Sequence, residues 1–299
     1  MTEPFLGSSG GVPRGQLRGP HYRRLSRDVF VLHDAELNHR GRVDAARLVF
    51  KDGLPCLQTA GLLLNLPVDD DGLVHLDRGP KAPRSRRADI KVHRFGIPEE
   101  QQHDLDGLKV ADGPRVFADL SDVLDLEALV ALGDVVARRW KDADIERAVE
   151  LHGKRRGAVL LKAAVPLLDR RSDSPAESRM RLRVHAAGSV RMRHKVVVRD
   201  IGGGWLGEPD LADEVAMVGI QHEGEVHFKK SEKQRKKDVG RDEVMRAEDW
   251  QIVISTSEDD QRPDRLMQKL RAAYYRQARL LGPQVHPDVL RLEGRNTAG

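Results

Sequence analysis

The sequence EPDLADEVAMVGIQHEGEVHF, residues 208–228, decides the expected fold of the C-terminal half of the chain. A Pro-Asp pair opens a short extended segment, and after an acidic turn an apolar run over 215–220 ends in polar residues. Short apolar and β-branched runs bounded by turn residues are typical of strands. We therefore predict two adjacent strands, with Asp210 on the first and Gln221 and Glu223 near the end of the second.

Three polar side chains of this stretch are expected to meet. Gln221 and Glu223 are two residues apart, so they project from the same face of their strand. If Asp210 lies opposite them on the neighbouring strand, its carboxylate converges with their oxygens. Carboxylates this close repel one another unless a cation or a proton is shared, and hard oxygen ligands suit Mg²⁺ or Mn²⁺. We therefore predict Asp210, Gln221 and Glu223 as metal ligands.

The elements around this stretch follow a definite order. In chain order, the pattern predicts a helix over 174–187, a strand over 195–199, a hairpin turn at the glycines 202–204, the two strands above, a basic helix over 231–247, a strand over 250–255 and a helix over 263–280. The predicted unit is therefore α-β-β-β-α-β-α, of mixed α/β (α+β) class.

Residues 172–272 resemble the family of small nuclease-fold proteins related to the very-short-patch repair endonuclease. The motifs that carry the resemblance are S-P-x-E at 174–177, P-D at 209–210, E-G-x-x-H at 223–227, a D…R-D pattern at 238–242 and D-W at 249–250. The resemblance implies the restriction-endonuclease-like fold, whose active site is written P-D…(D/E)-x-K. It also implies a DNA endonuclease that hydrolyses phosphodiester bonds with Mg²⁺ or Mn²⁺.

The resemblance assigns catalytic positions to Glu177, Asp210, Gln221, Glu223 and His227. Two of these depart from the family pattern, since Gln221 stands where an acidic residue is expected and Glu223 where a lysine is expected. An amide can ligate a metal through its oxygen but adds no negative charge, so the affinity for the metal should fall. Lys229 or Lys230 is a candidate replacement for the missing lysine.

Several of these residues also have a structural interpretation. Glu177 ends a Ser-Pro-Ala-Glu sequence, which is a capping box with proline at the first helical position. Gln221 and Glu223 also fit the solvated end of a strand. His227 fits a proton shuttle, a metal ligand, a phosphate contact or an ordinary structural histidine.

A basic segment follows the polar cluster directly. Residues 229–241 carry seven basic residues against two acidic ones. Such a segment next to an acidic site is suited to holding the DNA backbone, and the expected contacts are Lys229, Lys230, Lys233, Lys236 and Lys237. The alternative is an exposed helix face.

Composition sets wider bounds. The chain has 299 residues, which predicts two or three domains, and 51 basic against 47 acidic residues give a formal charge of only +4. Nucleic-acid binding must therefore be argued from local clusters. The single cysteine, Cys56, excludes an internal disulfide and a cysteine-built zinc site. The sequence has no long apolar stretch and no basic-then-apolar leader, so we expect a cytoplasmic protein that does not enter a membrane.

The N-terminal segment is rich in arginine. Residues 15–27 predict short helical pieces broken by a Gly-Pro pair, and residues 29–32 predict a strand. This order resembles the winged-helix region of the abortive-infection antitoxin family, which actinobacteria often place ahead of a nuclease-like domain. The resemblance implies that Arg18, Arg23, Arg24 and Arg27 contact DNA phosphates. The alternative is a solvated basic helix at a dimer or interdomain contact.

We predict four segments: a winged-helix-like domain over 1–80, a middle strand and helical region over 81–168, the restriction-endonuclease-like domain over 169–282 and a tail over 283–299. Apolar residues at helical spacing predict helices over 42–50 and 58–66 and two helices within 115–139, and the polar segment 98–114 is expected to be mostly loop. DNA is the expected partner. The alternative function is a non-catalytic, antitoxin-like DNA-binding regulator that uses the nuclease fold as a scaffold, with a toxin or another protein as a second partner.

Overall fold

The computed structural model describes residues 3–9, 11–83, 85–188, 191–223 and 244–286. The chain divides into two units, Met1–Leu167 and Leu168–Gly299. The start predicted for the nuclease-like domain, residue 169, lies one residue inside the second unit. Within the described ranges, no helix has the length and apolar character needed to span a bilayer.

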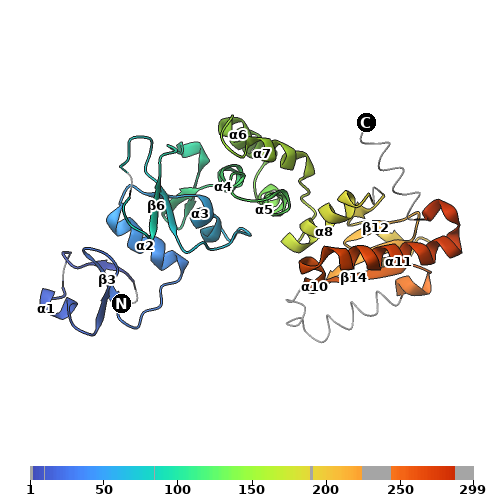
Figure 1. Ribbon diagram of the computed structural model, residues 1–299, viewed down its shortest axis with the longest axis horizontal. Helices are drawn as coiled ribbons and strands as arrows, with labels where there is room; N and C mark the ends of the chain where they lie inside the picture. The colour runs from blue at the N-terminus through green and yellow to red at the C-terminus, as the bar shows by residue number, and fades with distance from the viewer. Residues whose placement is uncertain (1–2, 10, 84, 189–190, 224–243, 287–299) are drawn as a thin grey trace. The chain divides into compact units, whose positions relative to one another are not determined.

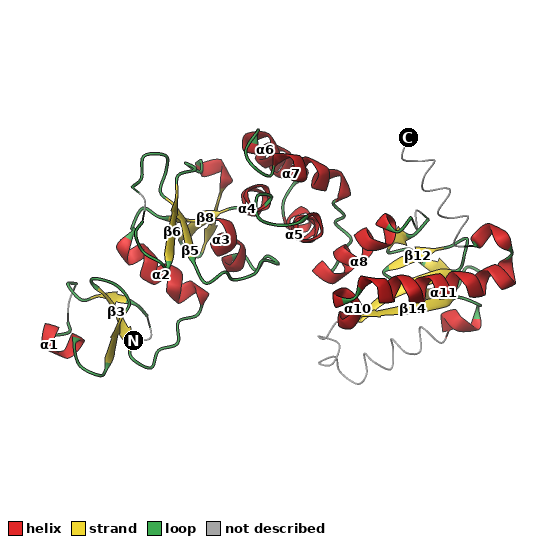
Figure 2. Ribbon diagram, viewed as in Figure 1, coloured by secondary structure: helices red, strands yellow, loops and turns green. Residues whose placement is uncertain are grey.

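Unit 1 combines small sheets with helices (Figures 1 and 2). Its strands are β1 (Phe5–Leu6), β2 (Tyr22–Arg24), β3 (Val29–Leu32), β4 (Leu54–Pro55), β5 (Val74–Asp77), β6 (Ile90–His93), β7 (Gln102–Leu105) and β8 (Leu108–Ala111). Its helices are α1 (Arg14–Leu17), α2 (His39–Val49), α3 (Leu57–Leu63), η1 (Glu99–Gln101), α4 (Gly113–Leu120), α5 (Leu126–Arg139), α6 (Asp142–His152), α7 (Ala158–Ala164) and η2 (Val165–Leu167). The strands form the sheets β1-β3-β2 and β4-β5-β6 and the hairpin β7-β8.

The N-terminal segment differs from the predicted basic helix. The helix α1 has four residues, and the chain then enters the strand β2, which pairs antiparallel with β3 and carries Arg23 and Arg24. A helix this short is not stable by itself, whereas the β2-β3 hairpin places Val29 and Val31 in the core. Strand pairing therefore overrides the local helical pattern, and the helix-turn-basic-helix expected of a winged helix is not formed here.

Two further expectations for unit 1 need correction. The boundary predicted at residue 80 falls inside a sheet, because β5 and β6 pair in parallel across it. The segment 98–114, expected to be mostly loop, contains the β7-β8 hairpin. Its turn residues Asp106 and Gly107 both have positive φ, 52° and 78°, and the Gly107 N–H donates to Asp104 Oδ1 at 2.7 Å. This is the geometry that an Asp-Gly pair favours between two strands.

Unit 2 contains a four-stranded mixed sheet with helices. Its elements are α8 (Pro175–Ala186), β9 (Arg193–His194), β10 (Val198–Arg199), β11 (Trp205–Gly207), β12 (Leu211–Asp213), β13 (Val218–Glu223), β14 (Gln251–Thr256), α10 (Ser257–Gln261), α11 (Pro263–Leu281) and η4 (Pro283–Val285). The sheet order is β14-β13-β12-β9, and only β13 and β14 are parallel. The described part begins with the predicted helix and ends with the predicted strand and helix, but five short strands, β9 to β13, stand where three were predicted. Of the strand predicted over 195–199 only Val198–Arg199 (β10) forms, because Lys195 has φ 51° and turns the chain between β9 and β10. Most of the basic helix predicted over 231–247 lies outside the described residues.

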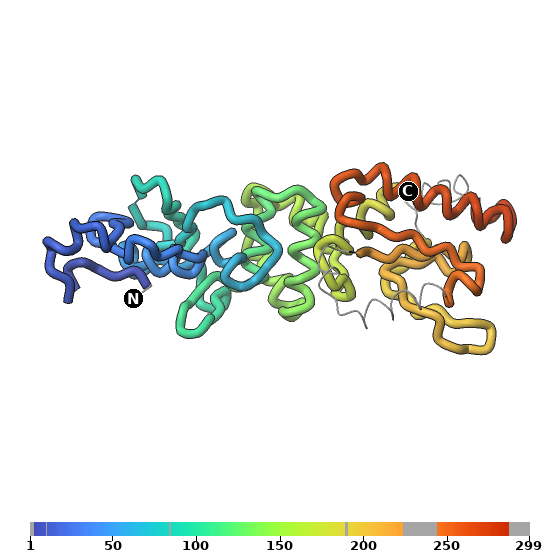
Figure 3. Tube along the Cα trace, turned by 90° about the horizontal axis from the view of Figure 1, so that it is seen from below, coloured from blue at the N-terminus to red at the C-terminus, as the bar shows by residue number. Residues whose placement is uncertain are grey.

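The two faces of this sheet are covered differently. Met180 of α8, Leu211 and Ile220 of the sheet and Leu270 of α11 belong to one buried cluster, so both long helices pack on the same face. Figure 3, turned by 90°, shows α11 in red lying over that face. The opposite face is covered by a second cluster that includes Trp250 and residues of the β10-β11 hairpin. The two faces alternate along β12, as the period of a strand requires.

A pair of histidines lies across β5 and β6 in unit 1. His75 is 3% exposed; its Nδ1 lies 3.0 Å from Nε2 of His93, and its Nε2 lies 2.8 Å from the carboxylate of Asp71. Burial, and then the proximity of His75, lower the pKa of His93 to about 4. Burial also lowers the pKa of His75. Both rings are therefore neutral in the folded protein near neutral pH.

We predict that unit 1 loses stability as the pH falls from about 6.5 to about 4. The unfolded chain protonates His93 near its ordinary pKa, while the folded chain does so only near pH 4, so acid favours unfolding in this window. The loss should be on the order of 1–2 kcal/mol, since the ring is partly exposed. In urea unfolding, His93→Gln should lose less stability over this pH range than the wild type does. The exposed control His103→Gln should lose as much as the wild type. An unchanged pH dependence in His93→Gln would contradict this.

Candidate functional site

Asp210 is the centre of a polar cluster at the end of strands β12 and β13. The register pairs Leu211 with Ile220, which brings Asp210 opposite Gln221. Asp210 is 2% exposed, and its Oδ2 accepts from Gln221 Nε2 at 3.0 Å and from the His222 N–H at 2.7 Å. The structure therefore brings together two of the three residues that the sequence predicted as metal ligands.

Lys195 supplies the cation of the cluster. Its Nζ donates to Asp210 Oδ1 at 2.8 Å and lies 3.2 Å from Asp173 Oδ2 and 3.5 Å from Glu177 Oε2. Burial disfavours the charged amine, but the hydrogen bond to Asp210 and the negative charges of Asp210 and Glu177 outweigh it and raise the pKa of Lys195 well above its ordinary value. The sequence pattern placed Lys195 only on a strand. The signal there was its position between the polar pair 193–194 and the apolar run 196–198.

Glu177 takes part in capping helix α8 and also faces the polar cluster. Ser174 caps helix α8, since its Oγ accepts from the Glu177 N–H at 3.2 Å and donates to Glu177 Oε1 at 3.0 Å. The second oxygen, Oε2, accepts from the Asp173 N–H at 3.1 Å and faces Lys195. The Ser174 cap and the Asp173 N–H therefore fix the carboxylate at the edge of the cluster. Asp173 lies next to the cap and was not predicted.

Two further residues extend the cluster behind Glu177. His194 is 4% exposed, its Nδ1 lies 3.0 Å from Asp169 Oδ2, and its Nε2 lies 4.0 Å from Glu177 Oε2. Burial opposes ionisation of Asp169, but the hydrogen bonds from Arg171 and His194 outweigh it and hold the pKa of Asp169 well below its ordinary value. The sequence pattern gave no indication of Asp169 or His194, because neither belongs to a recognised motif.

The remaining residues predicted in this half of the chain lie apart from the cluster or outside the described part. Glu223 is exposed at the end of β13, and within the described residues it makes no hydrogen bond or ion pair with Asp210 or Lys195. The residues outside the described ranges are His227, Lys229, Lys230, Lys233, Lys236 and Lys237.

The predicted arginines of unit 1 are exposed. Arg23 donates to the Ala35 carbonyl at 3.0 Å, and Arg24 donates to the carbonyls of Ser26 and Arg27, both at 2.8 Å. Arg18 follows helix α1 directly. Arg23 and Arg24 therefore have structural hydrogen bonds, and both guanidinium charges remain without a carboxylate partner among the described residues.

The oxygens around Lys195 are suited in kind to a hard divalent cation. Asp173, Glu177 and Asp210 give three carboxylates against one ammonium, so the formal charge is −2. Carboxylate and amide oxygens are ligands that Mg²⁺ accepts. Within the described ranges, however, no three Asp, Glu, His or Cys side chains are already arranged to hold a metal ion. Binding would therefore require Lys195 to move from between the carboxylates.

We predict that Lys195→Met lowers the free energy of unfolding of unit 2 by about 3 kcal/mol, because it leaves the buried Asp210 without its cation. Urea unfolding near neutral pH would measure the loss. The double variant Lys195→Met/Asp210→Asn should recover much of it, since both charges are then removed. The exposed neighbour Arg193 provides a control, and Arg193→Met should change the stability by less than about 0.5 kcal/mol. A Lys195→Met variant as stable as the wild type would show that the ion pair between Lys195 and Asp210 does not stabilise unit 2.

No family model matches the chain, and a search of curated protein sequences gives no significant match. Function is therefore inferred from the residues of the cluster, from their contacts and from their charge.

Proposed function

We propose that unit 2 is a DNA-acting module of the nuclease type that hydrolyses phosphodiester bonds with Mg²⁺ or Mn²⁺. The observation that carries the proposal is the buried Asp210, joined through Lys195 to Glu177 and Asp173 with a formal charge of −2. One divalent cation would balance that charge. The Pro-Asp pair directly before β12 and the helix α8 ahead of the sheet are consistent with this proposal.

Asp210, Glu177 and the amide oxygen of Gln221 are the groups that would hold the metal. A bound Mg²⁺ supplies charge neutralisation at the phosphate and lowers the pKa of a water molecule. Gln221 contributes no charge, which is why the carboxylate of Glu177 is needed to complete the donor set.

Lys195 takes the role that the family pattern gives to a lysine on the next strand. Its ammonium is the cation nearest to Asp210, and it can donate a hydrogen bond to a phosphate oxygen and stabilise negative charge that develops there. Glu177 orients the attacking water through its Oε2. His194 is a positioning residue, because its buried imidazole lies against Glu177 and is fixed by Asp169.

We predict that the protein nicks supercoiled plasmid DNA with Mg²⁺ or Mn²⁺ and not with EDTA. Asp210→Asn should lower the rate at least about 100-fold, since it removes the central carboxylate of the donor set. Lys195→Gln should also lower it while weakening DNA binding much less. Glu214 is an exposed carboxylate four residues away, and Glu214→Gln is the control that should keep full activity.

Circular dichroism would show that each variant is folded. Equal nicking by Asp210→Asn and the wild type would identify a contaminating nuclease. The absence of metal-dependent nicking by the folded wild type would overturn the proposed hydrolysis.

A second function, a non-catalytic DNA-binding regulator of the antitoxin type, is favoured by one observation. Asp210 already accepts hydrogen bonds from Lys195, Gln221 and the backbone of His222, so the carboxylate is satisfied without a metal. In that case DNA binding should be steeply dependent on salt and unchanged by EDTA and by Asp210→Asn. A toxin or another protein would be a further partner. Either function on chromosomal DNA would be carried out in the cytoplasm.

A further inference from the structure

The strongest unbalanced charge among the described residues of unit 1 lies in its first segment. Between Glu3 and Asp28 the chain has five arginines and no acidic residue. The structure places four of them, Arg14, Arg18, Arg24 and Arg27, along one open groove with a volume of about 1100 Å³. The groove lies beside α1 and the β1-β3-β2 sheet, and Leu48, Val49 and Arg87 complete its walls.

These four arginines are not neutralised within the protein. None forms an ion pair with a carboxylate among the described residues, whereas the nearby Arg40 and Arg78 pair with Asp44 and Asp52. Asp28 is the acidic residue that lines the groove, and it accepts hydrogen bonds from the backbone N–H and hydroxyl of Ser8. Arg24 is held by two backbone carbonyls, which fix its position without cancelling its charge. The groove therefore carries a net positive charge and suits an anionic ligand.

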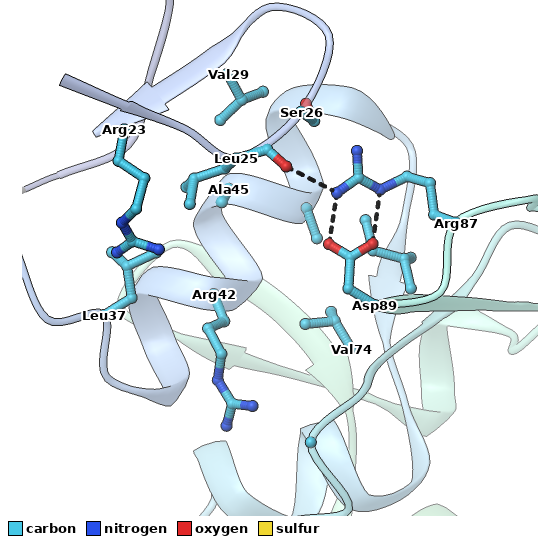
Figure 4. Close-up of a pocket in the computed structure, with 13 residues that line it drawn as sticks. Arg23, Leu25, Ser26, Val29, Leu37, Arg42, Ala45, Val74, Arg87 and Asp89 are labelled. Carbon is cyan, nitrogen blue, oxygen red and sulfur yellow. Dashed lines mark hydrogen bonds and ion pairs between the residues drawn. The ribbon is translucent and has the colours of Figure 1, made fainter. Parts of the chain in front are cut away.

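A smaller neighbouring pocket shows the contrast (Figure 4). Its volume is about 310 Å³, and it shares Arg87 with the groove. There Arg87 forms an ion pair with Asp89 and donates to the Leu25 carbonyl, as Figure 4 shows, and Arg42 pairs with Asp70. The cations of this pocket are thus largely engaged with the protein itself. The unbalanced charge lies in the groove.

Two aromatic side chains line the groove together with the arginines. Tyr22 of β2 and Phe30 of β3 line it and are half-buried. The ring of Phe5 supports both, with centroid distances of 5.7 Å to Tyr22 and 6.3 Å to Phe30. Guanidinium groups match phosphate oxygens, and aromatic faces stack on unpaired bases. A duplex keeps its bases stacked inside and cannot use such rings in this way.

We propose that this groove binds single-stranded nucleic acid, with phosphates on Arg14, Arg18 and Arg27 and bases against Tyr22 and Phe30. The site lies in unit 1 and needs no metal, so it goes beyond the proposed hydrolysis. An acidic peptide would satisfy the arginines but would leave the apolar rings without a stacking partner, which is why a nucleic acid is favoured.

The test is fluorescence anisotropy with the full-length chain and a labelled pyrimidine oligonucleotide of about 12 nucleotides, in EDTA, over a series of salt concentrations. The variant Arg14→Gln/Arg18→Gln/Arg27→Gln should bind at least about 10-fold more weakly at low salt. Its plot of log K against log salt should be flatter by about 2, since each single-strand phosphate contact contributes about 0.7. The matched control Arg40→Gln/Asp44→Asn removes an exposed ion pair of the same unit and should bind as the wild type does.

Tyr22→Leu tests the stacking contact separately. It should weaken binding of the single strand at least about 5-fold while leaving the salt slope unchanged, because it removes a ring and no charge. Tyr22→Phe keeps the ring and should restore binding. Since lysines within 229–237 are also predicted to contact DNA, the measured quantity is the difference between each variant and its control.

The outcomes separate this proposal from its rivals. Unchanged binding by the triple arginine variant would overturn the site. Equal loss for duplex and single strand, with no effect of Tyr22→Leu, would overturn the single-strand assignment in favour of a general phosphate surface. Displacement of the oligonucleotide by polyglutamate of equal charge, at equal concentration, would favour an acidic protein partner instead. Asp210→Asn should bind the oligonucleotide as the wild type does, because Asp210 lies outside the groove. A failure of the proposed hydrolysis would therefore not affect the proposed binding site.

Discussion

The ion pair between Lys195 and Asp210 is the interaction on which the arrangement of unit 2's polar cluster depends. Asp210 is buried, and a buried carboxylate is tolerated only when donors surround it. Its three donors come from different places: the turn between β9 and β10, the end of β13 and the backbone next to it. Lys195 then reaches Glu177 at the start of α8. One ammonium therefore connects the helix N-terminus to the sheet.

The sequence predicted the acidic half of this cluster better than the basic half. Strand patterns place Asp210 and Gln221 on neighbouring strands, and the capping motif places Glu177 at the first turn of a helix, because both follow local rules. Lys195 follows no such rule. It lies fifteen residues before Asp210, and it reaches the site because the chain has a positive φ there, which β-strand patterns do not predict for lysine. Glu223 shares the face of Gln221 in the strand pattern, yet periodicity says nothing about the distance to Asp210.

The same difference between local sequence patterns and long-range contacts explains which elements of unit 1 were predicted. The amphipathic helices α2 to α5 were predicted within a few residues, since their apolar residues recur at helical spacing. The segment 15–27 is too short and too polar for periodicity to decide, and its pairing with β3 depends on contacts made after collapse. The β7-β8 hairpin was missed although its Asp-Gly turn is a recognised signal. The strand β7 has the sequence QHDL and one apolar residue, so apolar alternation does not mark it as a strand.

The charges of the two units bear on how a nucleic acid could be held. A cluster with formal charge −2 repels a phosphodiester until a cation balances it, so the cluster itself cannot supply the affinity for DNA. Attraction must come from cations that carboxylates do not already neutralise. In the described residues of unit 1 such cations gather in the first segment, where no acidic residue lies between Glu3 and Asp28. The chemistry proposed for one unit and the binding proposed for the other therefore need opposite local charges, which is a physical reason to separate them along the chain.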